Sequence, residues 1–242
     1  MKTLVIGDIH GRRFWKRPVE KYINKVDKIV FLGDYFDAYQ DEGIEYEWEQ
    51  VLNNFNEIIE LKRANPDKVV LLLGNHDMHY RNAKFDEFTR STRFDEIHAN
   101  RLRHIFNDEN KDLFTTCFIA EVGKKKVIFS HAGITKFWLA KCDFKLDDSL
   151  EANINNLENT DKGIGNLCII GSQRTWLGDK AGSILWCDLS EFLNDEGLGK
   201  EYFQIFGHTR IKKGVLISSK EFACVDSQVC YLLDDKCKLK EA

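Results

Sequence analysis

Aspartate, histidine and asparagine side chains recur in this sequence directly behind short apolar runs. They are Asp8, His10, Asp34, Asp37, Asn75, His76, His131 and His208. Carboxylate, amide and imidazole groups together suit divalent metals such as manganese, iron, zinc, nickel and magnesium. No cysteine belongs to the set, which argues against a soft thiolate site. The residue types and their positions therefore predict a divalent metal centre.

Each of these residues, considered alone, also has a purely structural explanation. Asp8 would serve as a helix N-cap, and Asp34 would suit a turn. His131 or His208 would be an ordinary buried histidine with its hydrogen bonds satisfied. The set as a whole favours a metal site, because every structural explanation would have to hold independently.

The apolar runs are predicted to be buried strands that position these side chains. They occupy residues 3–8, 28–34, 68–77, 126–133 and 202–209. Helical patterns separate the first three, and the clearest covers 46–65. Alternation of strand and helix indicates a parallel sheet, whose strands are buried on both faces and are therefore continuously apolar. Ligands of such sheets bind beyond the carboxyl ends of the strands.

The rest of the chain gives weaker patterns. Residues 94–106 and 146–159 read as helices, and a hairpin is predicted around Gly123. The glycine-rich stretch that follows, up to residue 183, reads as a loop, and the C-terminal third reads as strands with turns.

Several histidines and tryptophans fall outside the strand-end pattern. His98 and His104 lie on the predicted helix at 94–106 and are interpreted as surface or packing residues, and His79 fits no pattern. Core packing is favoured over a substrate-facing position for Trp138, Trp176 and Trp186.

Length and composition indicate one cytoplasmic domain over residues 1–242. The 43% hydrophobic fraction supports a sizeable core, and the net charge of −4 does not favour nucleic acid or an anionic membrane as a partner. The short apolar run before Asp8 is neither a signal peptide nor a spanning helix. The seven cysteines form no C-x-x-C pair, so we interpret them as reduced thiols.

Five short blocks give the sequence a family resemblance. They are GDIHG (7–11), GDYFD (33–37), GNHD (74–77), SHAG (130–133) and GHT (207–209). In this order they resemble the calcineurin-like metallophosphoesterase superfamily, over residues 3 to about 227. The closest resemblance is to the phosphoprotein phosphatase branch and its bacterial and phage relatives, which include diadenosine tetraphosphatases. ILWCD (184–188) is similar to the Leu-Trp-Ser-Asp block of the protein phosphatases.

The resemblance implies a fold and a dinuclear metal centre. The fold is a four-layer α/β/β/α sandwich of two mixed sheets flanked by helices. One metal is implied to be held by Asp8, His10 and Asp34, and the second by Asp34, Asn75, His131 and His208. Two divalent ions, with manganese as the first choice, would activate a bridging hydroxide to attack phosphorus.

The same resemblance implies the catalytic pair. His76 matches the general acid that protonates the leaving oxygen, and Asp37 matches the carboxylate that orients this imidazole. Asp77 is expected to support the site by holding the loop or a ring nitrogen.

Two departures from the family pattern matter. Protein phosphatases carry Asp-Arg-Gly where this chain has Asp37-Ala38-Tyr39, so a phosphate-binding arginine must come from elsewhere. The candidates are Arg12, Arg13, Arg81, Arg174 and Arg210, of which Arg12 and Arg174 are favoured. The last block also lacks the second histidine of Gly-His-x-His, so the first metal is expected to keep a water.

The predicted activity is metal-dependent hydrolysis of a phosphate monoester, with a serine/threonine phosphoprotein as the first choice of substrate. A symmetrical dinucleoside tetraphosphate or another nucleotide is the alternative. A phosphodiesterase or nuclease of the same fold also stays open, although the near-neutral charge argues against nucleic acid. A non-catalytic binding module is least favoured, because no ligand or acid position has been lost.

Overall fold

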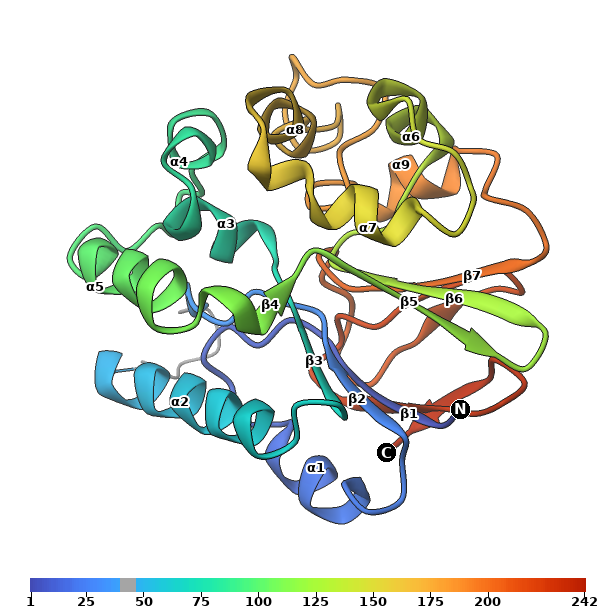
Figure 1. The fold of residues 1–242 in the computed structure, drawn as a ribbon, viewed down its shortest axis with the longest axis horizontal. Helices are drawn as coiled ribbons and strands as arrows, with labels where there is room; N and C mark the ends of the chain where they lie inside the picture. Colours follow the sequence, from blue (N-terminus) through green and yellow to red (C-terminus); the bar gives the residue numbers. More distant parts are fainter. Residues whose placement is uncertain (40–46) are drawn as a thin grey trace.

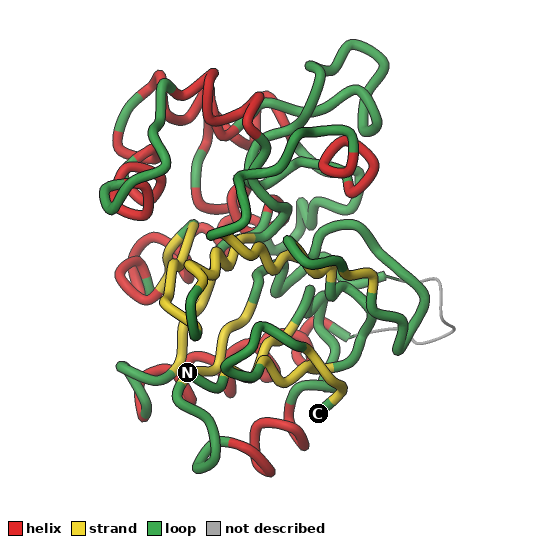
Figure 2. The backbone as a smooth tube through the Cα atoms, turned by 90° about the vertical axis from the view of Figure 1, so that its right-hand side faces the viewer, coloured by secondary structure: helices red, strands yellow, loops and turns green. Residues whose placement is uncertain are grey.

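Two mixed β-sheets lie face to face, with helices on both outer sides (Figure 1; Figure 2). The computed structural model describes residues 1–39 and 47–242. The two sheets and their flanking helices form the four-layer α/β/β/α sandwich expected from the sequence. No helix in the described part of the chain is long and apolar enough to cross a membrane.

The first sheet has six strands in the order β11-β10-β1-β2-β3-β4. Their bounds are Thr3–Ile6 (β1), Lys28–Phe31 (β2), Val69–Leu72 (β3), Phe114–Thr115 (β4), Cys230–Leu233 (β10) and Leu239–Glu241 (β11). Strands β1 to β4 run parallel. At one edge, β10 pairs antiparallel with β1, and β11 pairs antiparallel with β10. The parallel strands therefore end at one edge, as the predicted metal centre requires.

The second sheet has five strands in the order β5-β6-β7-β9-β8. Their bounds are Cys117–Val122 (β5), Lys125–Ser130 (β6), Tyr202–Phe206 (β7), Ile217–Ser218 (β8) and Phe222–Cys224 (β9). The hairpin predicted around Gly123 joins β5 to β6, and β6, β7 and β9 run parallel. The carboxyl ends of β6 and β7 carry the last two predicted ligands.

The helices cover the outer faces of both sheets. They are α1 (Lys16–Tyr22), α2 (Trp48–Ala64), α3 (Asn75–Arg81), α4 (Ala83–Thr89), α5 (Ala99–His104), α6 (Lys136–Cys142), α7 (Leu150–Asn155), α8 (Asp161–Leu167) and α9 (Leu189–Leu193). Short turns of other helix types cover Ile105–Glu109, Lys111–Leu113 and Leu157–Asn159. In Figure 1, α1 and α2 lie along the first sheet, and α6 to α9 lie along the second.

Alternate residues of the central strands face different cores. Leu4 and Ile6 of β1 pack toward the helices, whereas Val5 between them joins the core between the sheets. On the second sheet, Val127 and Phe129 of β6 face the same inter-sheet core. All five residues are fully buried, which explains why the strands read as continuous apolar runs.

Most predicted elements are confirmed, with two corrections in the helices. The predicted helix 46–65 is α2, although residue 46 lies outside the described residues, and 94–106 contains the shorter α5. The stretch at Asp161–Leu167, predicted as loop because of its glycines, is helix α8. A Cβ at Gly163 would collide with the backbone of Leu157, so tertiary packing outweighs glycine's low helix propensity here.

Candidate functional site

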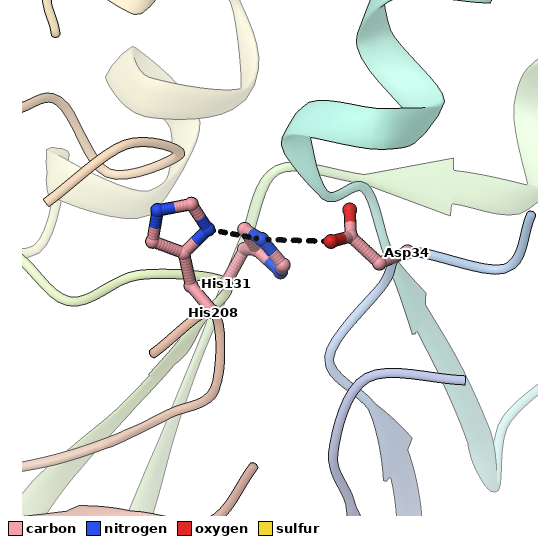
Figure 3. Close-up of side chains that lie close together, drawn as sticks. All are labelled: Asp34, His131 and His208. Carbon is pink, nitrogen blue, oxygen red and sulfur yellow. Dashed lines mark hydrogen bonds and ion pairs between the residues drawn. The ribbon is translucent and has the colours of Figure 1, made fainter. Parts of the chain in front are cut away.

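The six predicted metal ligands converge where the two sheets meet. Asp8 and His10 follow β1, Asp34 follows β2, and Asn75 opens α3 directly behind β3. The second sheet supplies the other two, which are His131 behind β6 and His208 behind β7. Figure 3 shows the imidazoles of His131 and His208 in line with the carboxylate of Asp34. The predicted residues therefore form one cluster, which we call the metal cluster.

Backbone carbonyls fix which ring nitrogen of two histidines faces the metal cluster. His131 donates Nδ1–H to the carbonyl of Leu32 at 2.9 Å, and His10 donates Nδ1–H to the carbonyl of Phe36 at 2.8 Å. A neutral ring held in this way presents the lone pair of Nε2 to the cluster. Metal-binding histidines are commonly held in this way.

The lone pairs in the cluster face other acceptors instead of donors. His131 Nε2 lies 2.9 Å from Asn75 Oδ1, and His10 Nε2 lies 3.3 Å from Asp34 Oδ2. His208 Nδ1 lies 3.1 Å from both Asn75 Oδ1 and His131 Nε2. Atoms that share one metal at bond lengths of about 2.1 Å are separated by such distances, about 3 Å. The donor set therefore fits divalent cations.

Burial of its carboxylates makes the metal cluster energetically unfavourable without a bound cation. Asp8 and Asp34 are both buried, and burial together with the neighbouring charge of Asp34 raises the pKa of Asp8 well above its usual value. Burial opposes ionisation of Asp34 too, but His131, His76 and His10 hold its pKa well below the usual value. Burial lowers the pKa of His10 to about 4, so the ring is neutral and available as a ligand at neutral pH.

Several site residues have strained backbone conformations. Positive φ angles occur at His10 (44°), Asp34 (55°), Asp37 (55°) and His208 (63°). Aspartate and histidine tolerate this region better than most residues, but it still costs about 1–2 kcal/mol each. The turns that aim these side chains are therefore maintained by the surrounding structure.

Asp77 holds two of the strand-end turns together. Its Oδ2 accepts hydrogen bonds from the backbone N–H groups of Asp34 and Gly74, both at 2.8 Å, and its Oδ1 accepts one from Tyr35 at 3.0 Å. A Cβ at Gly74 would collide with the Asp34 carboxylate, so glycine permits this close approach. Of the two roles expected for Asp77, the structure shows the loop-holding one.

A second cluster surrounds Asp37, and we call it the acid cluster. His76 Nδ1 lies 2.6 Å from Asp37 Oδ2, and Tyr80 donates its hydroxyl to Asp37 Oδ1 at 2.5 Å. His79 Nε2 lies 2.9 Å from the same Oδ2, off the line of a good hydrogen bond. Burial would raise the pKa of Asp37, but His76 and His79 lower it to about 2. The carboxylate is therefore ionised and bound on several sides.

Sequence reasoning found Asp37 and His76 but missed the other members of the acid cluster. His76, His79 and Tyr80 are spaced i, i+3, i+4 along α3, which places them on one helix face. Recognising that a helix starts at Asn75 would have revealed this face.

The candidate phosphate-binding arginines have different surroundings. Arg12 is buried, and its Nε and Nη2 have no hydrogen-bond partner among residues 1–39 and 47–242. Arg174 Nη2 lies 3.1 Å from both Asp188 Oδ2 and Thr209 Oγ1, at the edge of the site. Arg13 forms an ion pair with Glu57 at the surface. The side chain of Arg81 is largely buried and forms an ion pair with Glu158.

Guanidinium groups also gather around Tyr39. The Cζ atoms of Arg12, Arg93 and Arg210 lie 5.0, 3.7 and 4.7 Å from the centre of its ring. Sequence reasoning considered Arg12 and Arg210 but not Arg93. Arg93 lies in the segment between α4 and α5, which the sequence predicted poorly.

A cavity of about 420 Å³ opens over both clusters. Its lining includes His10, Asp34, Asn75, His76, Arg93, Arg174, Trp186 and His208. Core packing was favoured for three tryptophans and holds for Trp138, which is fully buried. It is wrong for Trp176, which is 90% exposed. Trp186 is half-buried; it packs against the core and also lines the cavity.

Solved structures with this fold include several phosphatases. A cold-active protein-tyrosine phosphatase from a Shewanella species matches with a TM-score of 0.56 and 16% identity over 99% of this chain and 80% of its own. A serine/threonine phosphatase from Saccharomyces cerevisiae matches with a TM-score of 0.53 and 13% identity over 100% of this chain and 79% of its own. These identities establish similarity of fold alone. A search of curated proteins finds no match to this sequence.

The family model of calcineurin-like phosphoesterases matches residues 1–209. The match includes all five sequence blocks and therefore both the metal cluster and the acid cluster. The chain belongs to the calcineurin-like phosphoesterases, hydrolases that act on phosphate esters with a dinuclear divalent metal centre.

Proposed function

We propose that the metal cluster holds two divalent ions, with manganese as the preferred metal. Asp8, His10 and Asp34 would hold one ion, and Asp34, Asn75, His131 and His208 would hold the other. Asp34 would be the only shared ligand. The facing lone pairs of His10, His131 and the oxygen ligands support this assignment. When bound, the ions supply charge neutralisation and an activated water for attack on phosphorus.

The protein's own side chains would supply proton transfer and phosphate binding. His76, protonated at Nε2, would give its proton to the leaving oxygen, while its Nδ1–H stays on Asp37. Asp37 would keep the imidazole oriented and would stabilise its charge. The unpaired donors of buried Arg12, together with Arg174 at the cavity edge, would bind phosphate oxygens.

The preferred substrate is a serine/threonine phosphoprotein. The observation that carries this choice is the 2.6 Å contact between His76 and Asp37 beside the metal cluster. A general acid matters most when the leaving group is a poorly stabilised alkoxide, as in a phosphoserine ester. A nucleotide phosphate leaves more easily and needs this proton less.

A dinucleoside polyphosphate is the second candidate. The guanidinium groups of Arg12, Arg93 and Arg210 around Tyr39 favour it, because several adjacent cations suit a substrate with more than one phosphate. A phosphodiester or single-stranded DNA is the third, and the net charge of −4 does not favour it.

A substrate panel tests the proposal. The manganese-loaded protein would be assayed on a phosphoserine peptide, a phosphothreonine peptide, diadenosine tetraphosphate, bis(p-nitrophenyl) phosphate and single-stranded DNA. We expect the highest kcat/KM on the phosphopeptides. A higher kcat/KM on diadenosine tetraphosphate would select the second candidate, and preferential cleavage of the last two substrates would select the third.

A further inference from the structure

Arg93 lines the cavity next to His76. Its Nη1 donates to the backbone carbonyl of Asp37 at 2.5 Å, and its Nη2 lies 3.0 Å from His76 Nε2. The guanidinium also lies against the ring of Tyr39 at 3.7 Å. These three contacts fix the position of a planar cation at the atom from which His76 would deliver its proton.

The segment that carries Arg93 is attached to the helix that carries His76. The Tyr80 hydroxyl on α3 accepts the backbone N–H of Asp95 at 2.7 Å. The Phe94 ring stacks on the Tyr80 ring with centroids 4.8 Å apart. The Cζ atom of Arg90 lies 4.3 Å from the centre of the Phe94 ring. These contacts therefore fix the position of the segment that carries Arg93 relative to the acid cluster.

No carboxylate in the described part of the chain neutralises the charge of Arg93. In residues 1–39 and 47–242, no aspartate or glutamate forms an ion pair with it, whereas Arg81 and Arg90 each have a carboxylate partner. The contacts described involve two of its five N–H groups, at the Asp37 carbonyl and at His76 Nε2, and the second must give way when Nε2 carries the proton that His76 would donate. A half-buried guanidinium with spare donors that lines a cavity suits a phosphate.

We propose that Arg93 binds the terminal oxygens of the substrate phosphate and makes the site selective for monoesters over diesters. This inference rests on the proposed function. A monoester dianion gains more from a guanidinium than a diester monoanion, which has one charge and one free oxygen fewer. Arg93 would thus take the role of the phosphate-binding arginine that the Asp37-Ala38-Tyr39 block lacks. The ring of Tyr39 would support the planar guanidinium group of Arg93.

Arg93→Gln and Arg93→Lys, prepared with manganese, test the assignment. Arg101→Gln is the matched control, because Arg101 is an exposed arginine on α5 that pairs with Glu109 away from the cavity. Binding of inorganic phosphate would be measured by calorimetry. Steady-state kinetics would give kcat and KM for p-nitrophenyl phosphate and for bis(p-nitrophenyl) phosphate. Elemental analysis and thermal unfolding would verify that metal content and folding are kept.

Arg93→Gln should weaken phosphate binding and raise KM for the monoester by about 10- to 100-fold, as for a lost hydrogen bond to a charged group. The KM for the diester should rise less than about threefold. The phosphate affinity and the monoester KM of Arg93→Lys should lie between those of Arg93→Gln and wild type. Unchanged phosphate affinity in Arg93→Gln, or equal losses on both substrates, would overturn the inference. Wild-type protein that binds phosphate through Arg93 but hydrolyses no ester would overturn the proposed function and still support Arg93 as a phosphate ligand.

Discussion

The metal cluster and the acid cluster lie side by side but are built differently. Every member of the metal cluster follows a β-strand within four residues, and its members come from both sheets. The acid cluster depends on α3, which carries His76, His79 and Tyr80 around the carboxylate of Asp37. The comparison teaches that a rigid sheet edge positions the proposed ligands, whereas a single helix face positions the proposed proton donor. Perturbing each cluster should therefore have separable effects.

The largest effect is expected from Asp34→Asn. Asparagine tolerates the positive φ of this position, so the turn should persist while the shared ligand loses its charge. We expect metal content to fall below two ions per chain and kcat/KM to fall by about 10³-fold or more. Elemental analysis and steady-state kinetics check this.

Asp86→Asn is the control for that variant. Asp86 is a buried carboxylate that forms ion pairs with Arg90 and Arg103 and is not among the residues that would bind metal. It should keep two metal ions and near wild-type turnover. A full complement of metal and normal activity in Asp34→Asn would show that Asp34 is not the shared ligand.

His76→Asn should leave the metal cluster intact and damage the acid cluster. Loss of a general acid lowers kcat by about 10²–10⁴-fold, with metal content nearly unchanged. The loss should be smaller for p-nitrophenyl phosphate than for a phosphoserine peptide, because p-nitrophenolate needs little protonation. Metal loss from this variant, or equal losses on the two substrates, would contradict the division between the clusters.

Asp37→Asn should reveal the acid cluster in the pH dependence of stability. The pKa of Asp37 is lowered from 3.8 to about 2, so its ionised form stabilises the fold above pH 3.8 and this contribution is lost as the pH falls toward 2. The shift corresponds to about 2 kcal/mol at neutral pH.

Denaturant unfolding of wild type and Asp37→Asn at several pH values would measure this contribution. The gap between them should be widest near pH 7 and should narrow as the pH falls below 4. A gap that does not change with pH would mean that the carboxylate's charge is not the source of the stabilisation.

Tyr80→Phe should have the smallest effect. It removes the hydrogen bond to Asp37 and the one that the hydroxyl accepts from the backbone N–H of Asp95, and a typical net loss of 0.5–1.5 kcal/mol for the bond to Asp37 corresponds to a roughly 2- to 10-fold lower kcat. Combined with Asp37→Asn, its effect on kcat should be smaller than in the wild-type background, because both changes act on the same carboxylate. Kinetics of the two single variants and the double variant would decide, and additive losses would place Tyr80 outside the acid cluster.

The metal cluster could be predicted from sequence because parallel strands fix where their ends lie. Asp8, Asp34 and Asn75 each follow an apolar run, and the register of the sheet then brings them together. The positions of Arg93 and Tyr80 depend on where α3 ends and how the next segment packs on it, which no periodic pattern encodes. Helix α8 was not predicted for a similar reason, since its Gly163 serves close packing against Leu157.

The metal cluster spans both sheets, and this has a consequence for the order of folding. The backbone N–H of His208 donates to the carboxylate of Asp8, a contact between residues 200 positions apart. Contacts of such long range form late, because a large loop must close before they contribute. Ions bound by the proposed ligands would therefore not nucleate folding, but they would hold the two formed layers together. Any opening that separates the layers should release metal before either sheet loses its own hydrogen bonds.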